Sequence, residues 1–289
     1  MENEHLQTSL RLARSIAVVL RGNGEALDEL LGAAELCRDA RLPDDFTGVG
    51  LVVWRQRRGA GAPPLRADLQ YIVDRQATVE RENAEALEAI ARLACGTEEP
   101  ALIGDGAVLL GLYGTLAAFR AAEWVVLVRQ GANGAAAAAA GGDLPFVLRV
   151  GPSQRLEVPL ARWSAGVEAA GCRWRVPVDE LFVVLLAARV GDPAALPSPP
   201  HWFHLAVAML AWRDRLNVHT VLTLADRLDL AAKAQRGLAM VGSLFPELKP
   251  GLDLSSFEIP LWERLLAVPV AARRVVRESM AEVVRGEGE

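Results

Sequence analysis

The spacing of apolar residues changes twice along this chain, and this change constrains the fold more than any other feature. Within residues 6–36 and 65–94, leucine, isoleucine and valine recur with the period of an amphipathic helix. Residues 124–128 and 146–150 are instead short apolar runs rich in valine and aromatic side chains, which is typical of strands. The helical spacing returns after Pro177. This order predicts an α/β (α+β) fold, in which N- and C-terminal helices flank a small mixed sheet.

Composition breaks divide the pattern into three parts. We expect an N-terminal helical region over residues 1–98, an α/β core over 99–176 and a C-terminal helical region over 177–289. The Gly- and Pro-rich stretch at 59–64 interrupts the first part before its long helix.

Within the core, the patterns predict a strand, a turn, a helix and a second strand, and then further strands after a connector. The connector is the alanine- and glycine-rich segment 131–142. We expect a strand pair around residues 156–158 and 173–176, and a last helix near the C-terminus at 270–284.

Composition also excludes several classes of protein. Hydrophobic residues make up 52% of the 289 positions, which is enough for a sizeable core. The chain lacks the roughly 18 uninterrupted apolar residues of a membrane span, and its acidic start is unlike a secretory signal, so we expect a cytoplasmic protein. A net charge of -5 makes a nucleic-acid partner an unfavoured interpretation. Cys37, Cys95 and Cys172 show no paired spacing and are interpreted as buried free thiols.

Several short motifs follow one another from the long helix into the C-terminal half. They are Glu80-Arg81-Glu82-Asn83, Ile103-Gly104-Asp105-Gly106, the run from Arg120 to Val128, and Asp179-Glu180. In this order they resemble the uncharacterised nucleotidyltransferases of the DNA polymerase β superfamily, the nucleotidyltransferase-5 family. The resemblance covers most of the chain and implies a nucleotidyltransferase-like core at 99–176.

The same motifs depart from the family at its metal ligands. In the family, two carboxylates one residue apart on a strand share a face and hold magnesium ions, because side chains alternate along a strand. Here Glu123 takes the first position and Val125 the second, and Leu148 lies on the strand that carries a third carboxylate in the family. A valine cannot bind a metal. We therefore expect Glu123 and Val125 to be vestigial, with no catalytic residue, no bound metal and no cofactor.

The turn Gly104-Asp105-Gly106 and Arg120 are candidates for residual nucleotide binding. Exposed N–H groups at a helix start attract phosphate. However, Asp105 would repel a phosphate, and the lysine that the family usually places in this turn is missing. A plain strand-to-helix turn with Asp105 as the N-cap is the competing interpretation.

Tryptophans beside arginines suggest an interface with another protein, because these residues are frequent anchors in interfaces. The candidates are Trp54 with Arg57, and Trp174 with Arg175. The arginine-rich segment around Arg57 is interpreted as a solvated loop.

Together these observations predict a catalytically inactive nucleotidyltransferase-like protein that acts as a protein-binding or assembly component. Two alternatives stay open. One is an active nucleotidyltransferase that uses magnesium, Glu123 and a displaced carboxylate, Asp143 or Glu157, to modify a protein or small molecule. The other is a sensor that binds a nucleotide at Gly104 to Gly106 without turnover.

Overall fold

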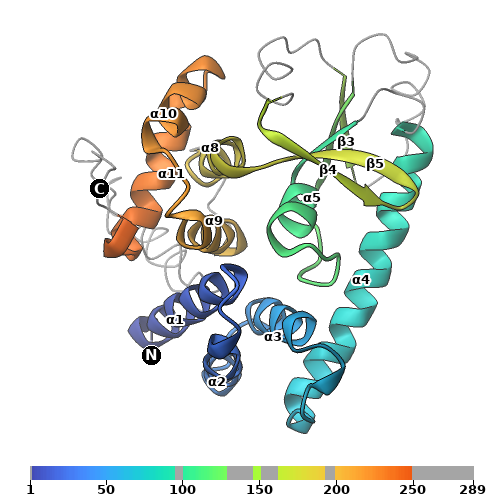
Figure 1. The fold of residues 1–289 in the computed structure, drawn as a ribbon, viewed down its shortest axis with the longest axis vertical. Coiled ribbons are helices and arrows are strands. Elements are labelled where there is room, and N and C mark those ends of the chain that lie inside the picture. Colours follow the sequence, from blue (N-terminus) through green and yellow to red (C-terminus); the bar gives the residue numbers. More distant parts are fainter. Residues whose placement is uncertain (1, 95–99, 129–145, 151–161, 193–198, 249–289) are drawn as a thin grey trace, which may run out of the picture. The chain divides into compact units, whose positions relative to one another are not determined.

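A computed structural model describes five segments of the chain (Figure 1). They are residues 2–94, 100–128, 146–150, 162–192 and 199–248. The predicted fold class is confirmed, because a mixed sheet lies between helical segments in the sequence. No helix of the described segments combines the length and apolar character needed to cross a membrane.

The chain folds into two compact units that each combine distant segments. Unit 1 contains Met1–Arg58, Leu186–Arg213 and Ala231–Glu289, and unit 2 contains Gly59–Leu185 and Asp214–Leu230. The three-part division expected along the sequence stays a prediction. In the structure, the long N-terminal helix belongs to the same unit as the sheet.

Unit 1 is helical. Its helices are α1 (Glu2–Leu20), α2 (Leu27–Asp39), α3 (Asp44–Arg58), the end of α8 (Asp179–Val190), α9 (Pro199–Trp212) and α11 (Ala231–Leu244), with short 3-10 turns at Gly24–Ala26 and Pro246–Leu248. The helix α1 packs against α2, α3 and α9. Aromatic rings fill part of the core, with Phe46 edge-on to Phe203 at 4.9 Å between ring centroids.

The helix α3 corrects one expectation. The segment around Arg57, interpreted as a loop, is the last turn of α3, where arginines complement the negative end of the helix dipole. Glycines weakened the helical signal here. A Cβ at Gly50 would lie 2.8 Å from Cδ1 of Leu12, so a larger residue here would require the Leu12 side chain to shift.

Unit 2 is built on a five-stranded sheet with the order β3-β2-β1-β5-β4. Its strands are β1 (Ala101–Gly104), β2 (Trp124–Val128), β3 (Phe146–Val150), β4 (Ser164–Ala169) and β5 (Cys172–Pro177). The pairs β1–β5 and β2–β3 are parallel, whereas β1–β2 and β4–β5 are antiparallel. Its helices are α4 (Ala67–Ala94), α5 (Asp105–Ala107), the π-helical turn η3 (Val108–Tyr113), the start of α8 and α10 (Val218–Arg227), with a 3-10 turn at Gly59–Gly61.

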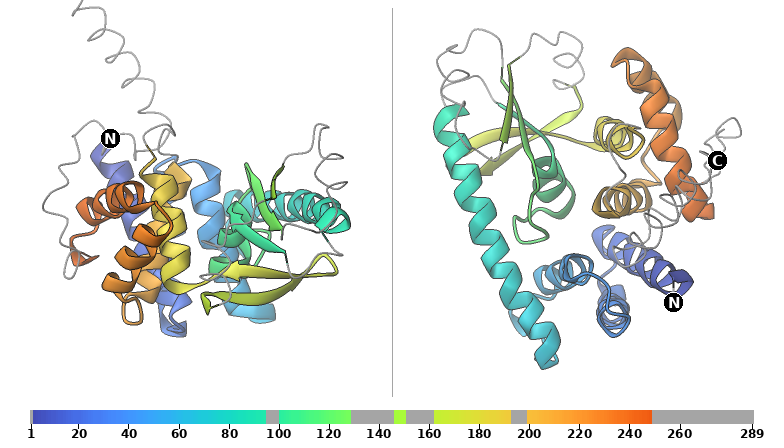
Figure 2. Two further views of the ribbon diagram at one scale, coloured as in Figure 1. Left: turned by 90° about the horizontal axis from the view of Figure 1, so that it is seen from above. Right: turned by 180° about the vertical axis from the view of Figure 1, so that it is seen from behind.

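The helix α5 and its continuation η3 cover one face of this sheet (Figure 2). Two glycines permit the close approach. A Cβ at Gly106 would lie 3.0 Å from the ring of Trp124, and one at Gly111 would lie 2.7 Å from Cγ1 of Val176. Trp124 of β2 and Val176 of β5, which lie against these glycines, are both buried.

Both strands expected at 124–128 and 146–150 are confirmed. The partner of β5 is β4, joined to it by a tight turn in which Ala170 and Gly171 both have positive φ. The expected strand at 156–158, the connector 131–142 and the helix 270–284 lie outside the described residues. Cys172 is disulfide-bonded, so its interpretation as a free thiol is wrong.

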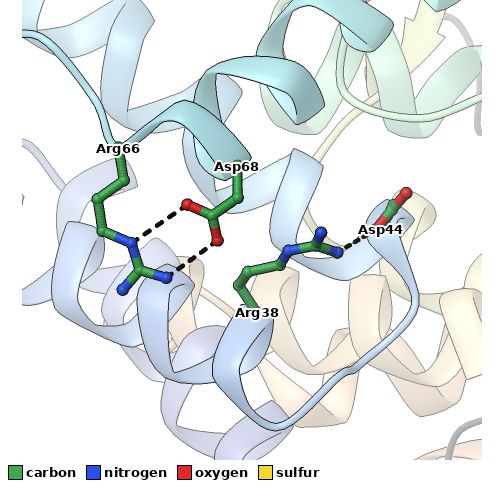
Figure 3. Close-up of polar contacts among 4 residues, drawn as sticks. All are labelled: Arg38, Asp44, Arg66 and Asp68. Carbon is green, nitrogen blue, oxygen red and sulfur yellow. Dashed lines mark hydrogen bonds and ion pairs between the residues drawn. The ribbon is translucent and has the colours of Figure 1, made fainter.

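Ion pairs fix the ends of several elements within each unit. In unit 2, Arg66 donates from Nε and Nη2 to both carboxylate oxygens of Asp68 at the start of α4, at 3.2 and 3.0 Å (Figure 3). These hydrogen bonds lower the pKa of the Asp68 carboxyl. In unit 1, Arg38 of α2 pairs with Asp44 of α3 at 3.3 Å (Figure 3).

Cys37 makes the stability of unit 1 sensitive to alkaline pH. It is a free cysteine buried in α2, and burial raises the pKa of its thiol from 9.0 to about 12. Because the unfolded chain ionises first, the stabilisation is complete below pH 9 and falls as the pH rises toward 12. Urea unfolding should show wild type losing about 1.4 kcal/mol more per pH unit in this window than Cys37→Ala. Parallel pH profiles for the two proteins would contradict this prediction.

Candidate functional site

The segment between η3 and β2, residues 114–123, carries Arg120 and Glu123 and is here called the β2 loop. The buried side chain of Asn83 in α4 binds the backbone of this loop through three hydrogen bonds. Its Nδ2 donates to the carbonyl oxygens of Leu116 and Phe119 at 2.7 and 2.8 Å. Its Oδ1 accepts from the N–H of Ala121 at 3.2 Å. Because Asn83 is buried, its side-chain amide depends on these hydrogen bonds for its polar partners.

Asp105 holds the other end of the β2 loop. Its buried Oδ2 accepts from the N–H groups of Ala122 and Glu123 at 2.9 and 3.2 Å. The expectation that Asp105 is an N-cap is therefore wrong: the N-cap of α5 is Gly104, which has a φ of 65° and makes no side-chain cap. The carboxylate of Asp105 binds backbone donors of the β2 loop and places a negative charge beside the turn.

The remaining nucleotide-binding candidates also have structural roles. The positive φ of Gly104 allows the sharp turn from β1 into α5, and Gly106 makes room for the ring of Trp124. Arg120 pairs with Glu82 of α4 at 2.6 Å. Its side chain is 64% exposed, so this pair is a surface contact between α4 and the β2 loop.

Glu123 and Val125 lie where β2 begins. Glu123 is half-buried in the β2 loop, and Val125 is buried in the strand. In the parallel pairing of β2 with β3, Val125 is the register partner of Val147, whereas Leu148 is the partner of Val126. The position beside Val125 is therefore occupied by Val147 rather than by Leu148. Neither residue of the pair can bind a metal.

Within the described segments, no group of three or more His, Cys, Asp or Glu side chains lies close enough to hold a metal ion. Asp143 and Glu157 lie outside the described residues.

The structure separates the candidate partner-binding residues into core and surface. Trp54 and Trp174 are only 1% and 0% exposed, so neither ring is available as an interface anchor. Nε1 of Trp174 donates to the carbonyl oxygen of Ala169 at 2.9 Å, within the β4–β5 hairpin. Arg57 is exposed, and the half-buried Arg175 donates from Nη1 to Oγ of Ser164 at 3.3 Å.

The role of Asn83 was not predicted, although the sequence carries a signal for it. Val79, Asn83 and Leu87 follow one another at intervals of four along α4, and all three are buried. A polar residue on the apolar face of a helix requires a hydrogen-bond partner, and here that partner is the β2 loop.

Replacing Asn83 tests this function directly. Asn83→Ala leaves two carbonyl oxygens and one N–H group without their partner, so we expect unit 2 to lose about 2–3 kcal/mol of stability. Asn83→Asp should be at least as damaging, because a carboxylate would face two carbonyl oxygens. Urea unfolding measures both effects, and Glu80→Ala on the exposed face of α4 is the matched control. Similar stability of Asn83→Ala and Glu80→Ala would contradict the assignment.

Comparisons of this chain with protein-family models, with curated proteins and with solved structures found no match.

Proposed function

We propose that this chain is a nucleotidyltransferase-like protein that has lost the catalytic metal site and acts as a protein-binding or assembly component. The order of its elements supports the resemblance. A long helix, a strand ending in glycine, a helical turn, Arg120 and a pair of parallel strands follow one another in unit 2. The same order of parts is expected for the nucleotidyltransferase-5 family.

The observation that carries the proposal is the pairing of Val125 with Val147. Nucleotidyl transfer depends on metal ions that neutralise the triphosphate and position it for attack. Those ions need carboxylate oxygens on one face of neighbouring strands. Val125 and Val147, which are register partners on β2 and β3, have side chains that supply none.

The turn before α5 supports the loss of nucleotide binding as well. The N–H groups of Ala122 and Glu123 donate to Oδ2 of Asp105. The acceptor of these two N–H groups is therefore a carboxylate of the protein and not a phosphate. A phosphate at this turn would meet the carboxylate of Asp105. This repulsion weighs against the alternative of a nucleotide sensor.

A transfer assay tests the catalytic part of the proposal. The purified protein is incubated with labelled ATP, GTP, CTP or UTP, with magnesium or manganese, and with lysate of its host. We expect no label on any acceptor. Label that appears with the wild type and disappears with Glu123→Ala would overturn the proposal and establish the active-enzyme alternative.

Purification from the host tests the binding part. The tagged protein is isolated at its native concentration, and its mass is measured by size-exclusion chromatography with light scattering. We expect a complex with a second protein in fixed stoichiometry. A monomer of 31.1 kDa without a partner would overturn this part.

A further inference from the structure

The strand β4 forms one edge of the sheet among the described strands. The N–H of Val178 donates to the carbonyl oxygen of Trp163 at 2.9 Å, which fixes the alternation of the ladder between β4 and β5. In an antiparallel pair every second residue directs its backbone groups to the partner strand. Ala165, Val167 and Ala169 therefore face β5, whereas the N–H and C=O groups of Gly166 and Glu168 point to the outer edge.

This edge has few of the features that protect sheet edges from pairing. The strand has the sequence Ser-Ala-Gly-Val-Glu-Ala, without proline or lysine, and its register with β5 runs through all its residues without a bulge. Gly166 and Glu168 are exposed. Small side chains and outward backbone groups suit the addition of another extended strand.

The side chains of two arginines of β5 extend over β4. Nη1 of Arg175 lies 3.3 Å from Oγ of Ser164, and Nε of Arg173 lies 3.0 Å from where a Cβ of Gly166 would be. Both contacts are diagonal to the register, in which Arg173 pairs with Glu168 and Arg175 with Gly166. The two guanidinium groups thus lie on one face of β4, with Glu168 as the opposing charge on this strand.

We propose that the β4 edge binds an extended acidic segment of a partner protein by strand addition. The inference rests on the proposed binding function and assigns its site. Backbone hydrogen bonds to Gly166 and Glu168 would hold the added strand, and carboxylates on alternate residues would meet Arg173 and Arg175. A second copy of this chain fits less well, because pairing β4 with β4 would bring two sets of arginines together.

Short synthetic peptides test the edge without knowledge of the partner. The probe is a fluorescent peptide in which valine and glutamate alternate, and its control replaces each glutamate with lysine. We expect the acidic peptide to bind at least about fivefold more tightly, from charge pairs with the Arg173 and Arg175 side chains that extend over β4. Arg173→Ser should reduce this preference. Equal binding of the two peptides would overturn the charge assignment.

Amide exchange locates the binding. Saturating acidic peptide should slow exchange of the Gly166 and Glu168 amides, which point outward. The amide of Val167 points to β5 and is the internal control. Protection of Gly166 and Glu168 already in the free protein, or unchanged exchange with peptide bound, would overturn the proposed edge.

A proline at the edge separates this inference from the function on which it rests. Glu168→Pro removes an outward N–H and leaves the ladder with β5, so it should weaken peptide binding at least about tenfold. Glu168→Ala is the matched control, since it removes the same charge but keeps the N–H. Circular dichroism and thermal unfolding check the fold of both, and Arg173→Ser tests the site if Glu168→Pro fails to fold.

The same variants are then purified from the host. A partner that binds wild type and Glu168→Ala but not Glu168→Pro supports the inference. A partner that binds all three overturns the edge assignment while the proposed function stands. No partner on the wild type overturns the function and the inference with it.

Discussion

Replacing Gly237 with alanine should cost unit 1 more than about 3 kcal/mol of stability. Gly237 lies in α11, and a Cβ there would be 2.0 Å from the carbonyl oxygen of Ala187 in α8. The contact is reciprocal, because a Cβ at Gly191 would be 2.0 Å from the carbonyl oxygen of Lys233. Both obstacles are backbone atoms. The clash is relieved only if the helices move apart, which breaks the packing along their whole contact.

Gly32→Ala is the matched control for this prediction. Gly32 lies inside α2, and a Cβ there would meet nothing within 4 Å. Alanine should therefore stabilise unit 1 by about 0.5–1 kcal/mol through its better helix propensity. Urea unfolding of the three proteins gives the comparison. Equal effects of Gly237→Ala and Gly32→Ala would show that the helices do not approach as closely as the structure has them.

The sequence predicted elements whose signals are local. Apolar periodicity located α1, α2 and α4, and β-branched runs located β2 and β3, because each pattern lies within the element that it specifies. The helix α3 was missed where local and tertiary requirements conflict. Gly50 weakens the helix by itself but permits contact with Leu12, a residue distant in sequence.

Two contacts of the structure were not predicted, one within a hairpin and one between helices. The partner of β5 was sought at 156–158, yet β4 is separated from β5 by only Ala170 and Gly171. The small residues of β4 gave little strand signal, since an exposed edge strand needs no apolar face. Similarly, the contact of Gly237 with Ala187 depends on how two helices meet, which no local pattern specifies.

In the candidate site too, some features were visible in the sequence and others depended on the structure. Val125 is visible in the sequence, and its apolar side chain argues against metal binding without any structure. The function of Asp105 depended on where its side chain points. Its carboxylate binds N–H groups of Ala122 and Glu123, whereas sequence reasoning considered only the helix that Asp105 begins. Register assigned Val147, rather than Leu148, to the position beside Val125.

Trp174→Ala should cost unit 2 about 3–5 kcal/mol. The indole is fully buried, and the substitution leaves a large cavity and removes the hydrogen bond from Nε1 to Ala169. Trp174→Phe should lie between alanine and wild type, because it keeps part of the packing but no donor. Trp163→Ala is the control on the preceding segment, where the half-buried ring stacks with Arg162 and should cost less.

Thermal and urea unfolding, measured beside partner binding, separate a core function of Trp174 from the interface function expected from sequence. As a core residue, Trp174 affects binding only through the folded fraction, so stability and binding should fall together. A Trp174→Ala protein with wild-type stability that no longer binds the partner would contradict the burial seen here. It would restore the tryptophan as an interface anchor and move the binding site from the β4 edge to the opposite face of the hairpin.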